Sequence, residues 1–269
     1  MQSCTVKGVT VGSGAPVRIM GIINCSPESF FSGSYVPEGA VRDRAFAMID
    51  EGAEVVDVGA RSTAPGSVPI TVTEEIERIE SALTELDGSG IAVSVDTMYP
   101  AVLDACLRHD IHLINDISGL SNPKYASIAA DSGLPVVAMA TTRLPGDPKG
   151  TEATLAALNL VVERARTAGV EGLILDPGVG RWTPERTYAD DWDLCRDFGR
   201  FKEAGYPVLL AISRKSFIGD LIGRPSEERL AATLALTARL LTDADMVRTH
   251  DVAATHDVVR VIGHMEQTL

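Results

Sequence analysis

Polar side chains end nearly every short apolar run of this 269-residue sequence. The runs end in Asn24, Asp57, Asp96, Asn115 with Asp116, Met139, Asp176, Ser213-Arg214-Lys215, and finally Arg248 with His250. One carboxylate can accept two adjacent N–H donors of a planar ring, and a cation beside an imidazole can hold an anion. The residue types therefore predict a ligand with an N–H-rich heterocycle at one end and an anion at the other.

The adjacent cations Arg214 and Lys215 are the most specific part of this pattern. They follow the unbroken apolar run "LLAIS" in a chain that has only five lysines. Arg248 and His250 are two residues apart, so both can point to the same side of a strand. Each residue also has a structural explanation: strand-end Asp and Asn cap helices or turns, Arg214 and Lys215 could form a solvated loop pair, and His250 could be a core histidine.

These side chains need a scaffold that brings the ends of several strands together. Apolar runs rich in β-branched residues cover 18–24, 54–59, 91–96, 112–117, 135–140, 172–177, 207–213 and 245–250. Their continuous apolar character is typical of parallel strands that are covered on both faces. Helical patterns lie between them, as at 37–53, 71–86, 98–110, 154–169 and 225–244.

The number and spacing of these runs predict an α/β fold, a single (β/α)₈ TIM barrel over residues 18–269. Residues 1–17 alternate, contain Gly-Ser-Gly and predict an N-terminal β-hairpin that covers the bottom of the barrel. A doubly wound open sheet is the competing architecture. Without a linker or low-complexity tract, we expect residues 1–269 to form one domain. In a TIM barrel the strand-end residues would converge on the catalytic face.

The composition restricts the partners. The formal net charge of −13 argues against nucleic acid or an anionic membrane, since both are bound through clustered Lys and Arg. The N-terminus has no apolar signal region, and the longest apolar helix candidate is too short to span a bilayer. The four cysteines lack metal or redox spacing. We therefore expect a soluble, cytoplasmic protein whose ligands are small molecules.

Seven motifs in this order resemble the dihydropteroate synthase family of pterin-binding enzymes. They are "MGIINCSPESF", "DVGARSTAPG", "SVDT", "INDISG", "ILDPGVG", "SRKSFIG" and "VRTHDV", and they extend from about Arg18 to Val252. The resemblance implies a transferase that joins p-aminobenzoate, or a related arylamine, to 6-hydroxymethyl-7,8-dihydropterin diphosphate and releases diphosphate. It also implies Mg²⁺ as cofactor and a homodimer.

The resemblance assigns roles to individual positions. Asp96, Asn115, Met139, Asp176 and Lys215 would bind the pterin, and Asn24, Thr63, Arg248 and His250 would hold the diphosphate, with Asn24 as the metal ligand. Lys215, Arg248 and His250 would be the catalytic residues. Phe30, Thr63, Pro65, Arg181, Arg214 and Ser216 would contact the arylamine. An arylamine is neutral and nucleophilic at neutral pH, so we expect no general base.

Three motifs depart from the family pattern, mainly on the arylamine side. Ala64 replaces the arginine of Ser-Thr-Arg-Pro-Gly, Arg181 stands where an aromatic residue is usual, and "AMATTRLPGD" replaces His-Met-Arg-Gly. We therefore hypothesise a larger arylamine, such as one bearing a ribosyl phosphate, with Arg181 or Arg143 meeting the extra anion. The alternatives are a pterin-dependent methyltransferase with a corrinoid partner and a non-catalytic pterin-binding protein.

Overall fold

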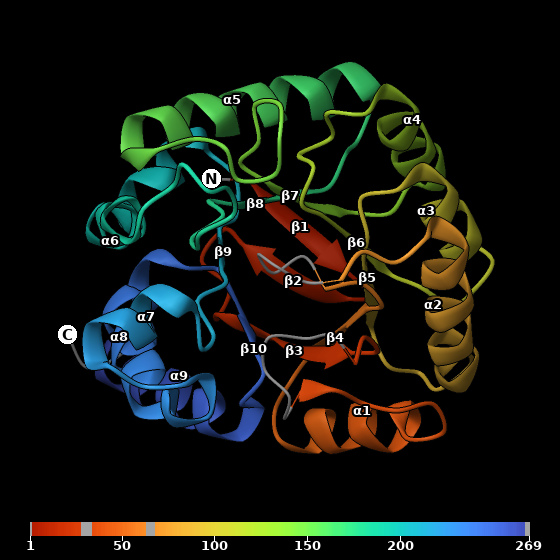
Figure 1. Ribbon diagram of the computed structural model, residues 1–269, viewed down its shortest axis with the longest axis horizontal. Coiled ribbons are helices and arrows are strands. Elements are labelled where there is room, and N and C mark those ends of the chain that lie inside the picture. The colour runs from red at the N-terminus through yellow and green to blue at the C-terminus, as the bar shows by residue number, and fades with distance from the viewer. Residues whose placement is uncertain (1, 28–33, 63–67, 267–269) are drawn as a thin grey trace.

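Eight parallel strands form the centre of the molecule in this computed structural model, which describes residues 2–27, 34–62 and 68–266. The strands are β3 (Arg18–Asn24), β4 (Val55–Gly59), β5 (Val93–Asp96), β6 (Leu113–Asp116), β7 (Val136–Met139), β8 (Leu173–Asp176), β9 (Leu209–Leu210) and β10 (Met246–Thr249). Their order is β8-β7-β6-β5-β4-β3-β10-β9, and a bridge between Leu175 and Val208 joins β8 to β9. The sheet thus closes, which confirms the TIM barrel and excludes the open doubly wound sheet (Figure 1).

The strands occupy the eight apolar runs of the sequence. Burial explains their lack of alternation: every residue of β4, β6, β7 and β8 is buried, because one face packs inside the barrel and the other against the helices. The seventh barrel strand is shorter than expected, since only Leu209 and Leu210 of the run at 207–213 are assigned to β9. The polar residues after it therefore belong to a loop.

Helices surround the barrel (Figure 1). They are α1 (Val41–Asp50), α2 (Val72–Leu86), α3 (Pro100–Cys106), α4 (Pro123–Ser132), α5 (Gly150–Ala168), α6 (Tyr188–Arg196), α7 (Ser216–Ile222), α8 (Leu230–Leu240) and α9 (Val252–Glu266), with 3₁₀ turns η2 (Phe198–Ala204), η3 (Ser226–Glu228) and η4 (Leu241–Asp243). Thr71 and Glu74 form a capping box that begins α2 at the predicted position. The helix predicted at 225–244 is instead divided into η3, α8 and η4. Within the described residues, no helix is both long and apolar enough to cross a membrane.

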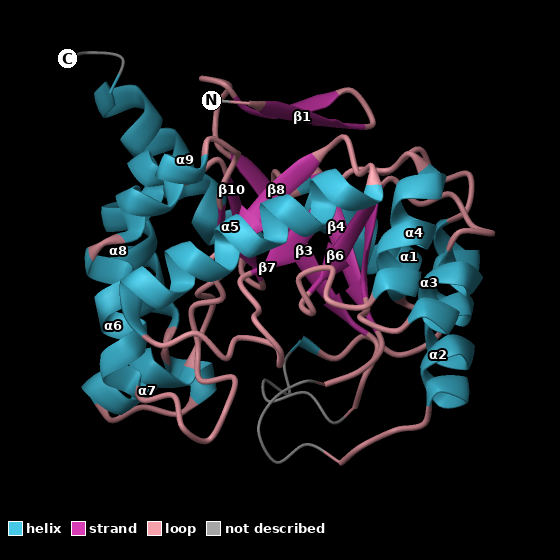
Figure 2. Ribbon diagram, turned by 90° about the horizontal axis from the view of Figure 1, so that it is seen from above, coloured by secondary structure: helices cyan, strands magenta, loops and turns pink. Residues whose placement is uncertain are grey.

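The predicted hairpin consists of β1 (Ser3–Val6) and β2 (Val9–Gly12), paired antiparallel. It lies across one end of the barrel (Figure 2). Val6 and Val11 are fully buried and pack in one cluster with Met20, Leu113 and other residues from the starts of the barrel strands. This apolar plug closes the bottom, so the polar strand ends gather at the opposite face.

Candidate active site

A cavity of about 460 Å³ opens at the carboxyl ends of the barrel strands. This volume is in the usual range for small-molecule sites. Nine of the predicted site residues line it: Asn24, Asp96, Asn115, Asp176, Arg181, Lys215, Ser216, Arg248 and His250. Their segments are far apart in the sequence, and the barrel brings them together.

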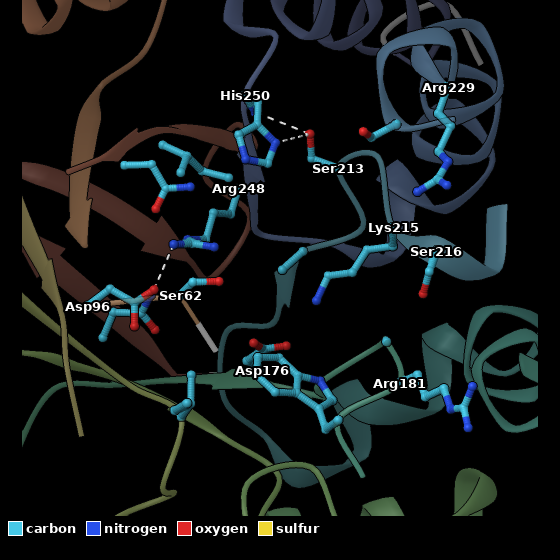
Figure 3. A pocket seen from close by; sticks show the side chains of 18 of the residues that line it. Ser62, Asp96, Asp176, Arg181, Ser213, Lys215, Ser216, Arg229, Arg248 and His250 are labelled. Carbon is cyan, nitrogen blue, oxygen red and sulfur yellow. Dashed lines mark hydrogen bonds and ion pairs between the residues drawn. The ribbon is translucent and has the colours of Figure 1, made fainter. Parts of the chain in front are cut away.

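Asp176 and Lys215 form one wall of the cavity (Figure 3). Asp176 is the last residue of β8, and its Oδ1 accepts a 2.7 Å hydrogen bond from the backbone N–H of Gly178. Burial raises the pKa of Asp176, although this hydrogen bond and the charge of Lys215 oppose the rise. Burial lowers the pKa of Lys215 to about 8, against the attraction of Asp176. The ammonium group points toward Asp176 and lies 4.7 Å from the centre of the Trp182 ring.

A second wall is built around Arg248 of β10. Its Nε donates to Asp57 Oδ2 at 2.6 Å, and its Nη2 donates to Asp96 Oδ2 at 2.8 Å. Asn115 Nδ2 donates to the same Asp57 oxygen at 3.0 Å. Asp57 is completely buried, so it fixes the directions of Arg248 and Asn115 from behind the cavity. Neither contact of Arg248 uses Nη1.

Asp96 has an unusual environment for a carboxyl group. Burial raises its pKa to about 7 even though the guanidinium of Arg248 opposes the change, and the negative charges of Asp57 and Glu75 add to the rise. The group therefore gains or loses a proton close to neutral pH. A protonated carboxyl can donate a hydrogen bond that a carboxylate cannot.

His250 follows the end of β10 and also lines the cavity. Its Nδ1 is 2.9 Å from Ser213 Oγ, and its backbone N–H donates to the same oxygen at 3.2 Å. The pKa of His250 is lowered to about 3, mainly by burial and also by the positive charges of Arg248, Arg214 and Lys215. The imidazole is thus neutral at pH 7, and it can donate a hydrogen bond to an anion without being charged.

Other predicted site residues have different positions. Met139 is 1% exposed and does not line the cavity, but it packs beneath the backbone of Gly178. Arg214 does not line the cavity either, because its guanidinium is directed to Asp251 and to the carbonyl groups of Ser226 and Glu227. This position does not favour the predicted contact between Arg214 and the arylamine.

Three more predicted residues, Phe30, Thr63 and Pro65, lie outside the described residues. Arg143, the alternative to Arg181 for an extra anion, is exposed and does not line the cavity. Arg181 does line it, at the side away from Asp96 and Arg248, where its guanidinium reaches Pro184 O at 3.4 Å (Figure 3).

The sequence reasoning missed several lining residues, among them Trp182, Tyr188, Arg61 and Arg229. Trp182 Nε1 donates to Gly178 O at 3.0 Å, which places the ring beside Lys215. The family usually has an aromatic residue at the position of Arg181, and Trp182 supplies one at the next position. This proximity to Arg181 was the sequence signal that could have identified Trp182 as a site residue. Arg61 and Arg229 gave none, because charged residues in loops are usually solvated.

A closed parallel barrel with acids, cations and a neutral imidazole around one cavity at its carboxyl end defines a TIM-barrel enzyme that binds a small polar molecule. A profile of the family described as pterin binding enzyme matches residues 20–250, and the chain therefore belongs to that family. Its relatives are dihydropteroate synthases. The Clostridium beijerinckii dihydropteroate synthase is 37% identical over 242 residues, 87% of this chain and 89% of that protein.

Two further comparisons extend this result. A probable bifunctional folylpolyglutamate synthase/dihydropteroate synthase from Haloferax volcanii is 36% identical over 86% of this chain, which spans only 28% of that longer protein. The solved Xanthomonas albilineans dihydropteroate synthase with 4-aminobenzoic acid has a TM-score of 0.84 and 33% identity, with 98% of each chain covered. The family resemblance inferred from the motifs is confirmed.

Proposed function

We propose that this protein is a transferase that condenses 6-hydroxymethyl-7,8-dihydropterin diphosphate with p-aminobenzoate and releases diphosphate. The observation that carries the proposal is the arrangement of one cavity, in which Asp176, Asn115 and Lys215 stand beside Arg248 and His250. The first three offer the acceptors and donors that a pterin edge requires, and the last two suit an anion. The membership in the pterin-binding family and the similarity to dihydropteroate synthases support the same conclusion.

The pterin would be held by Asp176 and Lys215. The carboxylate of Asp176 accepts from the 2-amino group and the adjacent ring N–H, and the ammonium of Lys215 donates to the oxo and ring-nitrogen acceptors. Asn115 and Asp96 would complete the recognition, and Asp57 holds Asn115 in place. Because these groups are preoriented by the strand ends, the pterin methylene takes a fixed position in the cavity.

The leaving diphosphate would be stabilised by Arg248 and His250. Departure of diphosphate places positive charge on the methylene and negative charge on the leaving oxygens, so donors aimed at those oxygens lower the barrier. Arg248 offers Nη1 while Asp57 and Asp96 hold its other side. Neutral His250 offers an N–H. The arylamine attacks the methylene and then loses its extra proton to solvent.

Magnesium fits this site as an ion that arrives with the diphosphate. Within residues 2–27, 34–62 and 68–266 there is no group of three or more His, Cys, Asp or Glu side chains that could hold a metal. Mg²⁺ is commonly bound by few protein oxygens together with substrate phosphates. Asn24 lines the cavity, and its amide nitrogen donates to Ser34 Oγ at 3.1 Å, so its oxygen is the atom to act as ligand. When bound, the ion neutralises charge on the leaving group.

The experiment that tests the proposal combines the protein with Mg²⁺, the dihydropterin diphosphate and p-aminobenzoate. Diphosphate release and formation of dihydropteroate, followed by mass, are the expected result. Pterin binding without diphosphate release for any arylamine would instead identify a non-catalytic pterin-binding protein. Transfer of a methyl group from a reduced pterin to a corrinoid protein would identify the methyltransferase.

A second candidate for the arylamine carries an anion beyond the ring, such as a ribosyl phosphate. Arg181 and Arg229 line the cavity together with Ser216. Within the described chain their guanidinium groups donate to backbone carbonyls, Arg181 to Pro184 and Arg229 to Arg214 and Arg224, and not to carboxylates. Two such cations are notable in a chain with a formal net charge of −13. Phosphate is well matched by the fork of guanidinium donors.

Specificity constants for p-aminobenzoate and for the phosphate-bearing arylamine distinguish the two candidates. If the second is correct, Arg181→Gln reduces the constant for the phosphate substrate much more than that for p-aminobenzoate, whereas Arg229→Gln also disturbs the Arg214 carbonyl contact and affects both substrates. The exposed Arg224, paired with Glu228, provides the matched control Arg224→Gln. Equal constants in the unaltered protein, or a preference for p-aminobenzoate, would reject the larger substrate.

The proposal also includes a cytoplasmic homodimer, as the family resemblance implies. Its support is that resemblance and the exposed apolar side chains of Leu221, Val261 and Met265 on α7 and α9. Sedimentation equilibrium at micromolar concentration tests the dimer, and a monomer at all concentrations would contradict it.

A further inference from the structure

Two consecutive cross-links join the loop after β9 to the loop after β10. Ser213 bonds to both Nδ1 and the backbone N–H of His250, at 2.9 and 3.2 Å. The next residue on each side is also paired: Arg214 Nε and Nη2 each donate at 2.8 Å to one oxygen of Asp251. Since β9 and β10 are neighbours in the barrel, the two loops are tied together directly above the strands.

Arg214 has a backbone conformation that residues with a Cβ rarely adopt. Its φ is +54°, and it stands immediately before Lys215. Such a conformation persists only where the surrounding contacts enforce it. Here the N–H of Arg214 donates to Thr233 Oγ1 at 3.2 Å, and its carbonyl accepts from Arg229 at 3.0 Å.

The side chain of Arg214 adds further constraints. Its Nη1 donates to the carbonyl oxygens of Ser226 and Glu227 at 2.9 and 2.8 Å, in addition to the bidentate pair with Asp251. These contacts anchor the loop to the segment before α8 and to the start of α9. The left-handed turn at Arg214 sets the direction in which the chain presents Lys215, the N-cap of α7.

Ser213 determines which nitrogen of His250 carries the proton. The Ser213 side chain is almost completely buried, and its oxygen already accepts from the backbone N–H of His250. The hydroxyl proton needs an acceptor, and Nδ1 of the neutral ring lies at hydrogen-bond distance. This geometry favours a ring that accepts at Nδ1 and carries its proton on Nε2.

We infer that Ser213, Arg214 and Asp251 are positioning residues: the paired cross-links hold Lys215 at the pterin and present His250 as a neutral Nε2–H donor to the leaving diphosphate. The catalytic part of this inference rests on the proposed function. None of the three residues needs to contact a substrate. The cross-links connect pterin binding to diphosphate departure, because the same pair of loops carries Lys215, which binds the pterin, and His250, which binds the diphosphate.

The experiment compares Ser213→Ala, Ser213→Thr, Arg214→Lys and Asp251→Asn in the full chain, with Arg224→Lys as the control at an exposed pair. For Ser213→Ala and Arg214→Lys we expect kcat to fall by about 10² with little change in the KM of the arylamine, as misplacement of reacting groups does. Ser213→Thr keeps the hydroxyl and restores most of kcat, and Arg224→Lys has no effect.

A spectroscopic measurement separates positioning from general damage to the fold. In protein labelled with ¹⁵N-histidine, the His250 signals, identified by their loss in His250→Gln, should show Nε2 protonated and Nδ1 unprotonated. Ser213→Ala should shift the ring toward a mixture of tautomers while the thermal midpoint remains within a few degrees.

Two results would overturn the inference: protonated Nδ1 in the unaltered protein, or unchanged kcat in both Ser213→Ala and Arg214→Lys. If Ser213→Ala or Arg214→Lys fails to fold, the kcat of Asp251→Asn and the His250 tautomer of the unaltered protein still test the inference. Absence of turnover in the unaltered protein would refute the proposed function instead. In that case the tautomer and the affinity of Arg214→Lys for the dihydropterin still test the positioning.

Discussion

The affinity for the pterin should fall as the pH rises from 7 to 9, because Lys215 loses its charge in this interval. Burial lowers the pKa of Lys215 from its ordinary value of 10.5 to about 8, and the nearby charge of Arg248 contributes, although Asp176 opposes both. The ammonium form is the one that donates to the oxo and ring-nitrogen acceptors of the pterin. Binding therefore depends on the protonated fraction of Lys215 in the free protein.

The magnitude follows from that pKa. With a pKa of about 8, Lys215 is about nine-tenths charged at pH 7 and about one-tenth charged at pH 9. The apparent Kd should thus increase about tenfold, a loss of about 1.4 kcal/mol per tenfold change. A lysine with an ordinary pKa would produce almost no change over the same interval.

Calorimetric titration with 6-hydroxymethyl-7,8-dihydropterin, which lacks the diphosphate, isolates the pterin half of the site. Lys215→Arg is the matched control, because guanidinium remains charged at pH 9 and its profile reports any titration of the ligand itself and of Asp96, whose pKa is about 7. The reasoning is refuted if the Kd of the unaltered protein is constant from pH 7 to 9, or if both proteins have the same profile. Lys215→Ala should remove turnover and pterin binding and leave the fold intact, and normal pterin affinity would refute the assigned role.

Three other predictions concern the same region. Asp176→Asn removes a charged acceptor, so pterin affinity should fall roughly 10- to 100-fold by calorimetry, and a change below about threefold would contradict its role. Arg186 and Asp191 form an ion pair in which both side chains are completely inaccessible to solvent. Arg186→Ala therefore leaves the Asp191 carboxylate buried without its positively charged partner. It should cost about 3–5 kcal/mol in chemical denaturation, whereas replacing both by Met and Leu should recover most of the loss. Gly180→Ala places a Cβ 2.9 Å from Lys215 Nζ at a φ of +133°, so pterin affinity should weaken roughly tenfold. Unchanged affinity would show that Lys215 can move aside.

The positions of the strand-end residues could be predicted because burial on both faces leaves a clear mark. A parallel barrel strand is apolar along most of its length, so a polar residue that closes an apolar run marks its end and its place on the catalytic face, although Asp57 lies inside β4 and Arg248 inside β10. Asn24, Asp96 and Asp176 were found in this way, and all three are the last residues of their strands. The hairpin was also visible from its alternation, although its turn lies at Lys7 and Gly8, and the Gly-Ser-Gly signal marks the end of β2 instead.

The directions of loop side chains could not be predicted. Arg214 and Lys215 are adjacent, yet Lys215 lines the cavity while Arg214 turns to Asp251. The left-handed backbone at Arg214 causes this divergence, and contacts with Thr233 and Arg229 hold it. Nothing local in "SRKSF" specifies such a turn.

The sequence by itself determined the barrel, the hairpin, the family and nine of the twenty lining residues, because each depends on a local pattern of apolar runs and on motifs in order. Tertiary structure decided how those residues are charged and aimed. Arg248 meets Asp57 and Asp96 across 191 and 152 residues of sequence, and Trp182 lies against Lys215 from another loop. The physical reason is that burial and the distances between charges set a pKa and an ion pair, and both exist only after the barrel has closed.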